Sequence, residues 1–170
     1  KLFKNKKFDY VIANQVLEHV EDPIEFLKLC KNQISANGRI ILSFPNSDSL
    51  TRKMLGKNWL HWHAPYHLNH FNRKSIKILA GKVGLKIIST KTVSPNLWTA
   101  LQLRRLAIPR KMGERDMFWD GGEYKKQDSD KTTTENNFRR YFRLIEEYFL
   151  PNRLVDFLQM GESFLITFSR

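Results

Sequence analysis

The sequence places four of its five histidines within ten residues, at His61, His63, His67 and His70. Imidazole nitrogens bind zinc and exchange protons near neutral pH, so a cluster of them is a candidate for either chemistry. The spacing matches no closed zinc motif, and no cysteine lies nearby. The cluster therefore stays a candidate for proton transfer, with simple packing against the neighbouring aromatic residues as the alternative.

The fifth histidine, His19, directly follows Glu18 in a short stretch that begins at Asn14. A carboxylate beside an imidazole can accept or deliver a proton when a substrate comes within hydrogen-bond reach. The structural alternative is that Glu18 caps a turn and His19 bonds to the backbone. A position of Glu18 and His19 near a functional site and this structural alternative are about equally favoured. A catalytic role for the two residues is less favoured than the structural alternative.

Four strands are expected to position these groups. Residues 8–13 and 39–44 are short, apolar and rich in β-branched side chains, which is typical of strands buried inside a parallel sheet. The pair Asn37–Gly38 predicts a turn just before the second of these strands. Further strands are expected over residues 85–93 and 163–168.

Helices are expected between these strands. Asp22 and Pro23 predict a helix start, and apolar residues at helical spacing carry that helix to about Ile34. Asn72 predicts the cap of another helix, which Gly84 should end. Strands that alternate with helices are typical of an α/β fold, and the ligand crevice of such a fold lies where the strands end. Residues 14–19 directly follow the first strand and are therefore expected there.

Beyond residue 95 the periodicity becomes helical and then breaks. The polar stretch 125–137 predicts a loop. Residues 138–149 place aromatic side chains on one helical face with arginines opposite, a pattern that could cover a lipid-linked ligand or lie on a membrane. Such a face is more often part of a core.

Composition narrows the classes of function. The chain has 170 residues and a formal charge of +12, with 16 Lys and Arg against 6 Asp and Glu up to residue 96. Dispersed lysines of this kind usually form a solvated face, so no nucleic-acid partner is expected. Cys30 is the only cysteine and is expected in the core. The absence of a long apolar run or a secretory signal predicts a cytoplasmic protein.

Several segments resemble class I S-adenosylmethionine-dependent methyltransferases, in the group that includes the ubiquinone-biosynthesis O-methyltransferases. The most specific is the pattern Leu-Glu-His-Val-x-Asp-Pro at Leu17–Pro23. The order of the other segments agrees, with a fifth strand, a lid and a final strand at residues 38–46, 65–71 and 161–165. The resemblance implies a partial Rossmann-like sheet made of strands 4-5-7-6 of the family order 3-2-1-4-5-7-6, with flanking helices and a helical insertion.

The same resemblance divides the chain and assigns roles. Residues 1–95 would be the carboxy-terminal half of the Rossmann-like domain, 96–150 a helical or loop insertion, and 151–170 the closing helix and last strand. The cofactor, S-adenosylmethionine, would be contacted by Asn14, Gln15, Val16 and Leu17, and the catalytic candidates would be Glu18, His19 and His67.

A metal is not expected. In the ubiquinone-type relatives this loop can bind a divalent ion through two carboxylates and a histidine, but Gln15 stands where one carboxylate would be. Hard ions prefer charged oxygen ligands, so the replacement disfavours the site. The lid aromatics Trp59, Trp62 and Tyr66 would shape the pocket for a small or lipid-linked acceptor, with packing on the sheet as the alternative for the tryptophans.

The family's glycine-rich cofactor loop has no counterpart, because only Lys1–Phe8 precede the first strand. The resemblance therefore implies a carboxy-terminal part that is inactive alone. The strand 9–13 would become a sheet edge that is apolar on both faces, and such an edge predicts self-association. The alternatives to an enzyme are a non-catalytic interaction domain and a basic nucleic-acid-binding module.

Overall fold

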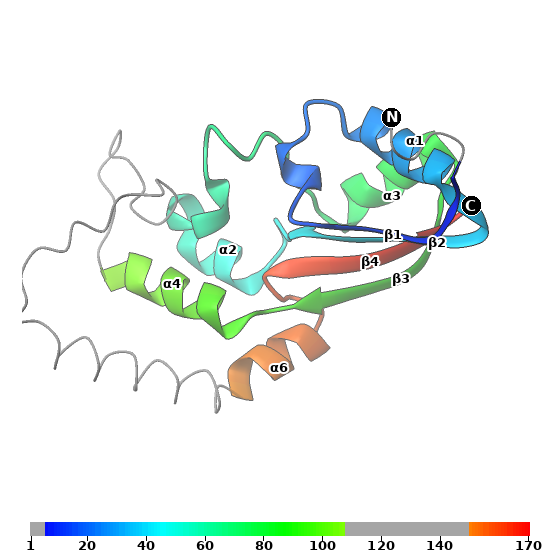
Figure 1. Cartoon of the computed structure of the whole chain (residues 1–170). Helices are drawn as coiled ribbons and strands as arrows, with labels where there is room; N and C mark the ends of the chain where they lie inside the picture. Colours follow the sequence, from blue (N-terminus) through cyan, green and yellow to red (C-terminus); the bar gives the residue numbers. More distant parts are fainter. Residues whose placement is uncertain (1–5, 108–149) are drawn as a thin grey trace, which may run out of the picture.

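A computed structural model of the chain describes residues 6–107 and 150–170, which form a four-stranded sheet with helices on both sides (Figure 1). The sheet order is β1-β2-β4-β3; β1 and β2 are parallel, and β4 is antiparallel to both of its neighbours. The strands are β1 Phe8–Asn14, β2 Ile34–Pro45, β3 Lys86–Val93 and β4 Ser163–Ser169. The α/β fold and the order expected from the resemblance, with the last strand inserted beside the second, are confirmed.

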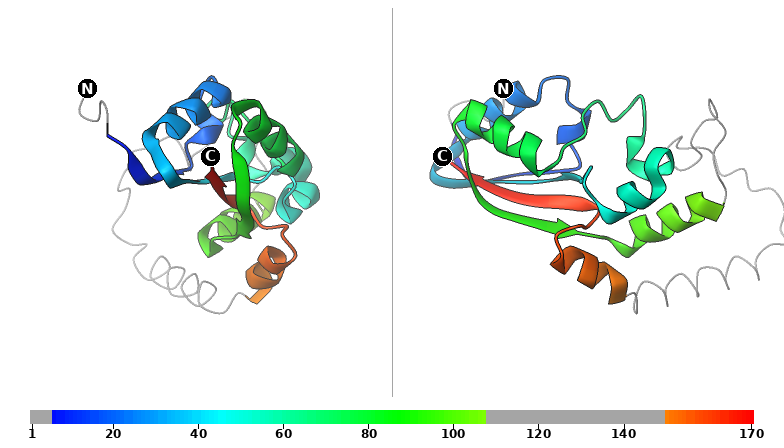
Figure 2. Two further views of the ribbon diagram at one scale, coloured as in Figure 1. Left: turned by 90° about the vertical axis from the view of Figure 1, so that its right-hand side faces the viewer. Right: turned by 180° about the vertical axis from the view of Figure 1, so that it is seen from behind.

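Two helices, α1 (Pro23–Gln33) and α3 (Arg73–Val83), cover one face of the sheet side by side (Figures 1 and 2). Their predicted caps are present: the Asp22 carboxylate accepts hydrogen bonds from two amides of the first turn, and Asn72 forms a capping box with Ser75. Gly84 ends α3 in the left-handed conformation, at φ 65°, that favours glycine.

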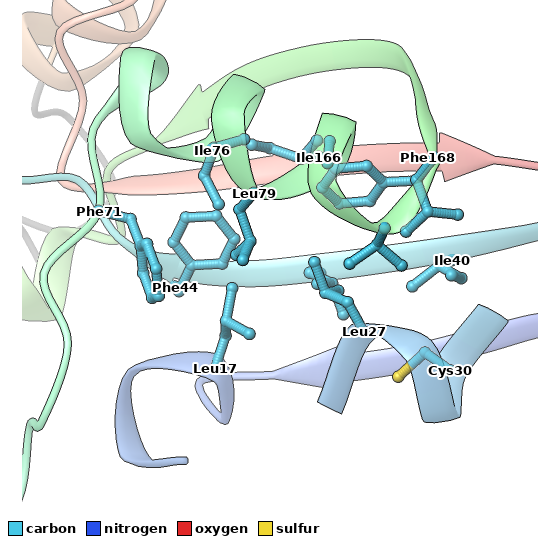
Figure 3. Packing of buried hydrophobic residues seen from close by; sticks show 14 of the residues in the cluster. Leu17, Leu27, Cys30, Ile40, Phe44, Phe71, Ile76, Leu79, Ile166 and Phe168 are labelled. Carbon is cyan, nitrogen blue, oxygen red and sulfur yellow. The ribbon is translucent and has the colours of Figure 1, made fainter. Parts of the chain in front are cut away.

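The core lies between these helices and the sheet (Figure 3). Alternate residues of β2 and β4 point into it and are opposite one another in the register, and all of them are fully buried: Ile40, Leu42, Phe44, Phe164, Ile166 and Phe168. Alternation of this kind follows from the two-residue period of a strand. Cys30 packs in the same core, as expected, and burial raises the pKa of its thiol to about 11.

The start of β2 differs from the prediction. The strand begins at Ile34, directly after α1, and includes Asn37 and Gly38, so the turn predicted there is wrong. The pairing with β1 instead shifts register between Phe8 and Tyr10, which accommodates the extra residues as a strand irregularity. Asn37 and Gly38 therefore lie at this strand irregularity and not in a turn.

The segment between β2 and α3 contains short helices that the sequence did not predict. They are α2 (Leu50–Leu55), η2 (Gly56–Asn58) and η3 (Leu60–Trp62). Helix α4 (Asn96–Ala107) follows β3 in the sequence. Helix α6 (Leu150–Phe157) precedes β4 in the sequence and packs against β3. The predicted loop 125–137 and the aromatic helix 138–149 lie outside the described residues.

Strand β1 is one edge of the described sheet, and its apolar side chains are unequally covered. Val11 and Ala13 pack against the core, whereas Tyr10 and Ile12 are 62% and 68% exposed on the opposite face. Among residues 6–107 and 150–170, no helix has the length and apolar character needed to span a membrane.

Candidate functional site

The turn after β1 is fixed by its neighbour, β2. Gln15 adopts a positive φ of 52°, which is uncommon for a residue with a side chain. Its amide donates to the Ser43 carbonyl at 2.8 Å, and its side-chain Nε2 donates to Ser43 Oγ at 3.0 Å. Ser43 Oγ in turn donates to Asn14 Oδ1 at 2.6 Å. The turn that follows the strand therefore has a defined conformation.

The remaining two residues expected to contact the cofactor differ in their surroundings. Val16 is partly exposed, whereas the Leu17 side chain is buried and packs in the core with Phe44 and Leu27 (Figure 3). Leu17 can therefore contact a ligand at this end of the sheet through its backbone but not through its side chain. A 3-10 helix, η1 (Leu17–His19), then carries the chain past the strand end.

The lid segment is joined to this loop by its backbone. The amides of Leu68 and Asn69 both donate to the Glu18 carbonyl, at 2.8 and 3.0 Å. The Asn69 side chain also donates to the Val20 carbonyl, at 2.6 Å. These bonds explain how two segments about 50 residues apart in the sequence are held at one end of the sheet.

The junction brings the three predicted catalytic residues together. One ligand atom from each of Glu18, His19 and His67 lies within 4.8 Å of the others. His19 Nε2 is 3.9 Å from Glu18 Oε1, and the His19 and His67 rings meet edge to face with centroids 4.7 Å apart. Glu18 and His67 are buried, at 1% and 8% exposure, while His19 is 41% exposed.

His67 is the centre of a larger cluster that contains every histidine of the sequence. Its ring centroid lies 4.7 Å from that of His19, 4.9 Å from His63, 6.4 Å from His61 and 6.3 Å from His70. The sequence grouped four of these residues by spacing, but it did not place His19 with them.

Backbone carbonyls fix the orientation of two of these rings. His19 Nδ1 is 2.9 Å from the Tyr66 carbonyl oxygen, and His67 Nδ1 is 2.8 Å from that of His61. A carbonyl can only accept, so each Nδ1 carries a proton, and in a neutral ring Nε2 then holds the lone pair. For His19 this backbone bond is the one expected from the structural alternative.

Burial shifts the charges of the two inner residues. It lowers the pKa of His67 to about 4, although the bond to His61 opposes this, so the ring is neutral near neutral pH. Burial also raises the pKa of the Glu18 carboxyl above its usual 4.5. Neither Glu18 oxygen accepts a hydrogen bond from the described part of the chain, so Glu18 is not a turn cap.

Behind the cluster lies a buried polar group that the sequence analysis missed. Glu162, directly before β4, accepts a hydrogen bond from Gln102 Nε2 at 3.2 Å and lies 3.6 Å from His61 Nε2. Gln102 also accepts a hydrogen bond from the Leu60 amide at 3.0 Å, so α4, η3 and the residue before β4 meet here. No spacing in the sequence indicates this contact, since its members lie about 40 to 100 residues apart.

The aromatic residues near the lid differ in burial. Trp59 is buried at 1% exposure and packs edge to face on Trp62 and His61 of its own segment. Trp62 is less buried, and its Nε1 donates to the Gly56 carbonyl at 2.8 Å. Tyr66 is 56% exposed and lies beside the His63 ring, with centroids 4.9 Å apart.

Comparison with known families identifies the fold around this junction. The model of the methyltransferase domain family matches residues 1–90, which is more than half of the chain. The chain belongs to this methyltransferase family. The match includes β1, the loop with Glu18 and His19, and the lid with His67. No curated protein sequence matches the chain closely enough to count as a relative.

Several solved structures are similar to the chain. One is an S-adenosylmethionine-dependent methyltransferase from Archaeoglobus fulgidus, with 18% identity, a TM-score of 0.48 and coverage of 97% of this chain and 60% of that one. Another is phosphoethanolamine N-methyltransferase 2 of Haemonchus contortus, with 13% identity, a TM-score of 0.47 and coverage of 96% and 33%. A cyclopropane synthase of Mycobacterium tuberculosis has 12% identity, a TM-score of 0.45 and coverage of 96% and 55%. The chain thus spans at most 60% of these proteins.

Proposed function

We propose that this chain forms part of an enzyme that transfers a methyl group from S-adenosylmethionine to oxygen or nitrogen of a small or lipid-linked acceptor. The observation that carries the proposal is the junction of Glu18, His19 and His67 at the end of β1, inside the region that matches the methyltransferase family. Crevices for ligands in open α/β sheets lie at such strand ends. The ubiquinone-biosynthesis O-methyltransferase group is the subgroup we propose, on the Leu17–Pro23 pattern.

Methyl transfer is a direct displacement at a sulfonium, so the protein must align the acceptor with the methyl group and remove its proton. In this proposal Asn14, Gln15, Val16 and the Leu17 backbone line the cofactor. The acceptor lies on the side of His19, which is the exposed member of the junction. A hydroxyl there has imidazole and carboxylate proton acceptors within one small group.

The organisation we propose follows the strand order. Residues 1–95 and 151–170 form the carboxy-terminal half of one Rossmann-like domain, and residues 96–150 are an insertion in it. Among residues 6–107 and 150–170, no strand is followed by a glycine-rich loop. The proposal therefore requires that the glycine-rich loop of the cofactor site lie outside residues 1–170, and that the chain by itself bind S-adenosylmethionine very weakly.

Two measurements test this function. Calorimetric titration of the 170-residue chain with S-adenosylmethionine should show very weak binding, and micromolar affinity would contradict the proposed division of the cofactor site. Transfer of labelled methyl groups should be measured with a protein that carries this chain together with the glycine-rich loop. His67→Ala should lower turnover there by about a hundredfold. His63→Ala, in the same cluster, should leave turnover nearly unchanged, and equal effects of the two variants would refute the assignment.

A second function is favoured by one observation, the exposure of Tyr10 and Ile12 on the edge strand. An edge strand with apolar side chains recruits another chain, and we propose that strand 9–13 mediates self-association. A non-catalytic interaction domain would keep this property without any cofactor binding.

A further inference from the structure

The guanidinium of Arg52, on α2, is partly buried and has no anionic partner. Its Nε atom is almost inaccessible to solvent and has no hydrogen-bond acceptor in the part of the chain that the structure describes. None of the ion pairs found within that part includes Arg52. A buried cationic donor without an acceptor costs free energy, and a bound anion would remove that cost.

The Arg52 side chain lies over a tryptophan whose position is fixed. Its Cζ atom is 5.9 Å from the centre of the Trp62 ring, within the distance of about 6 Å at which the ring face attracts a cation. Trp62 Nε1 donates to the Gly56 carbonyl at 2.8 Å, and the Gly56 amide donates to the Arg52 carbonyl at the end of α2. A guanidinium held over an aromatic face can still donate from its edge to a planar oxyanion.

The surroundings of Arg52 carry little negative charge. Residues 49–107 contain 11 Lys and Arg and no Asp or Glu, so no carboxylate of this segment competes with an incoming anion. Glu162 lies near Thr51 of α2, but burial raises the pKa of its carboxyl and thereby favours the neutral form. Exposed lysines attract anions only weakly, whereas Arg52 adds donors in a fixed position.

Helix α2 follows β2 and lies at the end of the sheet that holds the candidate site (Figure 1). The Trp62 ring meets the His70 ring with centroids 4.8 Å apart, and the His70 ring lies 6.3 Å from that of His67. Two aromatic rings therefore separate Arg52 from the junction of Glu18, His19 and His67. A ligand that reaches both would carry its anionic group away from the atom that reacts.

We infer that Arg52, held over Trp62, binds a phosphate or carboxylate group of the acceptor. Both groups present two oxygens that accept hydrogen bonds from one guanidinium, and such paired bonds are among the strong ones in proteins. That the ligand is the acceptor rests on the proposed function. Binding of the oxyanion itself does not, because it can be measured without cofactor or methyl transfer.

The test is a titration of the 170-residue chain, labelled with nitrogen-15, with inorganic phosphate and separately with acetate at constant ionic strength. The indole N–H resonance of Trp62, identified by its loss in Trp62→Phe, should shift and saturate. Saturable binding of either anion supports the inference, and the anion that binds more tightly indicates the acceptor group. Arg52→Lys keeps the charge but loses the paired donors, so binding should weaken by about tenfold or more.

Two further variants separate a site from general attraction. Lys53→Ala removes an exposed charge from the same helix and should change the affinity by less than about twofold. Arg52→Gln keeps a planar polar group without charge and should abolish binding, with folding of each variant verified by circular dichroism.

The inference would be overturned by the absence of a saturable shift with both anions, or by equal weakening in Arg52→Lys and Lys53→Ala. Anion binding at Arg52 without methyl transfer, in the protein that also carries the glycine-rich loop, would count against the proposed function alone. Methyl transfer without anion binding at Arg52 would overturn this inference alone.

Discussion

Replacement of Glu162 by glutamine should remove a pH dependence of stability that the buried carboxyl creates. Glu162 is 2% exposed, and burial raises its pKa above the usual 4.5, with Asp156 acting in the same direction. Gln102 donates to Oε2, and His61 Nε2 lies 3.6 Å away. Glutamine keeps an acceptor for Gln102 at the Oε2 position and, like the protonated carboxyl, carries no charge, so at acidic pH we expect a stability change within about 1 kcal/mol.

The sign and size of the pH effect follow from proton linkage. A raised pKa in the folded state means that the folded protein keeps its proton while the unfolded chain has released it. The contribution of Glu162 to stability is then complete below pH 4.5 and decreases as pH rises toward the folded pKa. For one proton the limiting slope is about 1.4 kcal/mol per pH unit. As pH rises, the free energy of unfolding of the wild-type protein should therefore fall relative to that of the Glu162→Gln variant, by up to this amount per pH unit.

Urea unfolding of both proteins, followed by tryptophan fluorescence at several pH values from about 5 to about 7, measures this difference directly. Groups that titrate equally in both proteins cancel when the two free energies of unfolding are subtracted. A difference that stays flat over this range would refute the argument, because it would mean that Glu162 ionises equally in the folded and unfolded states. If the wild-type protein instead became more stable than the variant as pH rises, the pKa of Glu162 would be lowered in the folded state and not raised.

Two further predictions concern packing and the sheet edge. Gly161→Ala should destabilise the fold by about 1–3 kcal/mol, because the new methyl group would meet Asp156 Oδ1 and would lie 2.8 Å from Ser94 Oγ. Gly81→Ala on α3, with nothing within 4 Å of the new methyl group, is the control and should not destabilise it in thermal unfolding. Ile12→Lys should abolish the proposed self-association in light scattering without loss of stability, since Ile12 is 68% exposed. Ile88→Lys on β3, at the other edge of the sheet, is the control and should leave self-association unchanged. Persistent association of the Ile12 variant would contradict pairing through β1.

The fold was largely predictable because its signals are local. The buried strands, the Asp22 and Asn72 caps and the Gly84 stop are each encoded within a few residues, and all four strands were placed. The turn predicted at Asn37–Gly38 failed because β2 already begins at Ile34 and takes up these residues where its register with β1 shifts, and no local signal announces that shift. Glu18, His19 and His67 could also be predicted from local patterns, because the first two belong to the motif after β1 and the third to a compact group of histidines.

The two buried carboxyls of the site show what sequence could not supply. Glu18 and Glu162 are both nearly inaccessible, and burial raises the pKa of each. Yet Glu162 receives a hydrogen bond from Gln102, which lies 60 residues away, whereas Glu18 receives none from the described chain. A carboxyl whose partner is built into the fold tolerates an amide in its place, because the partner remains satisfied. Glu18 has no such partner among residues 6–107 and 150–170, so an amide in its place has no hydrogen bond to preserve.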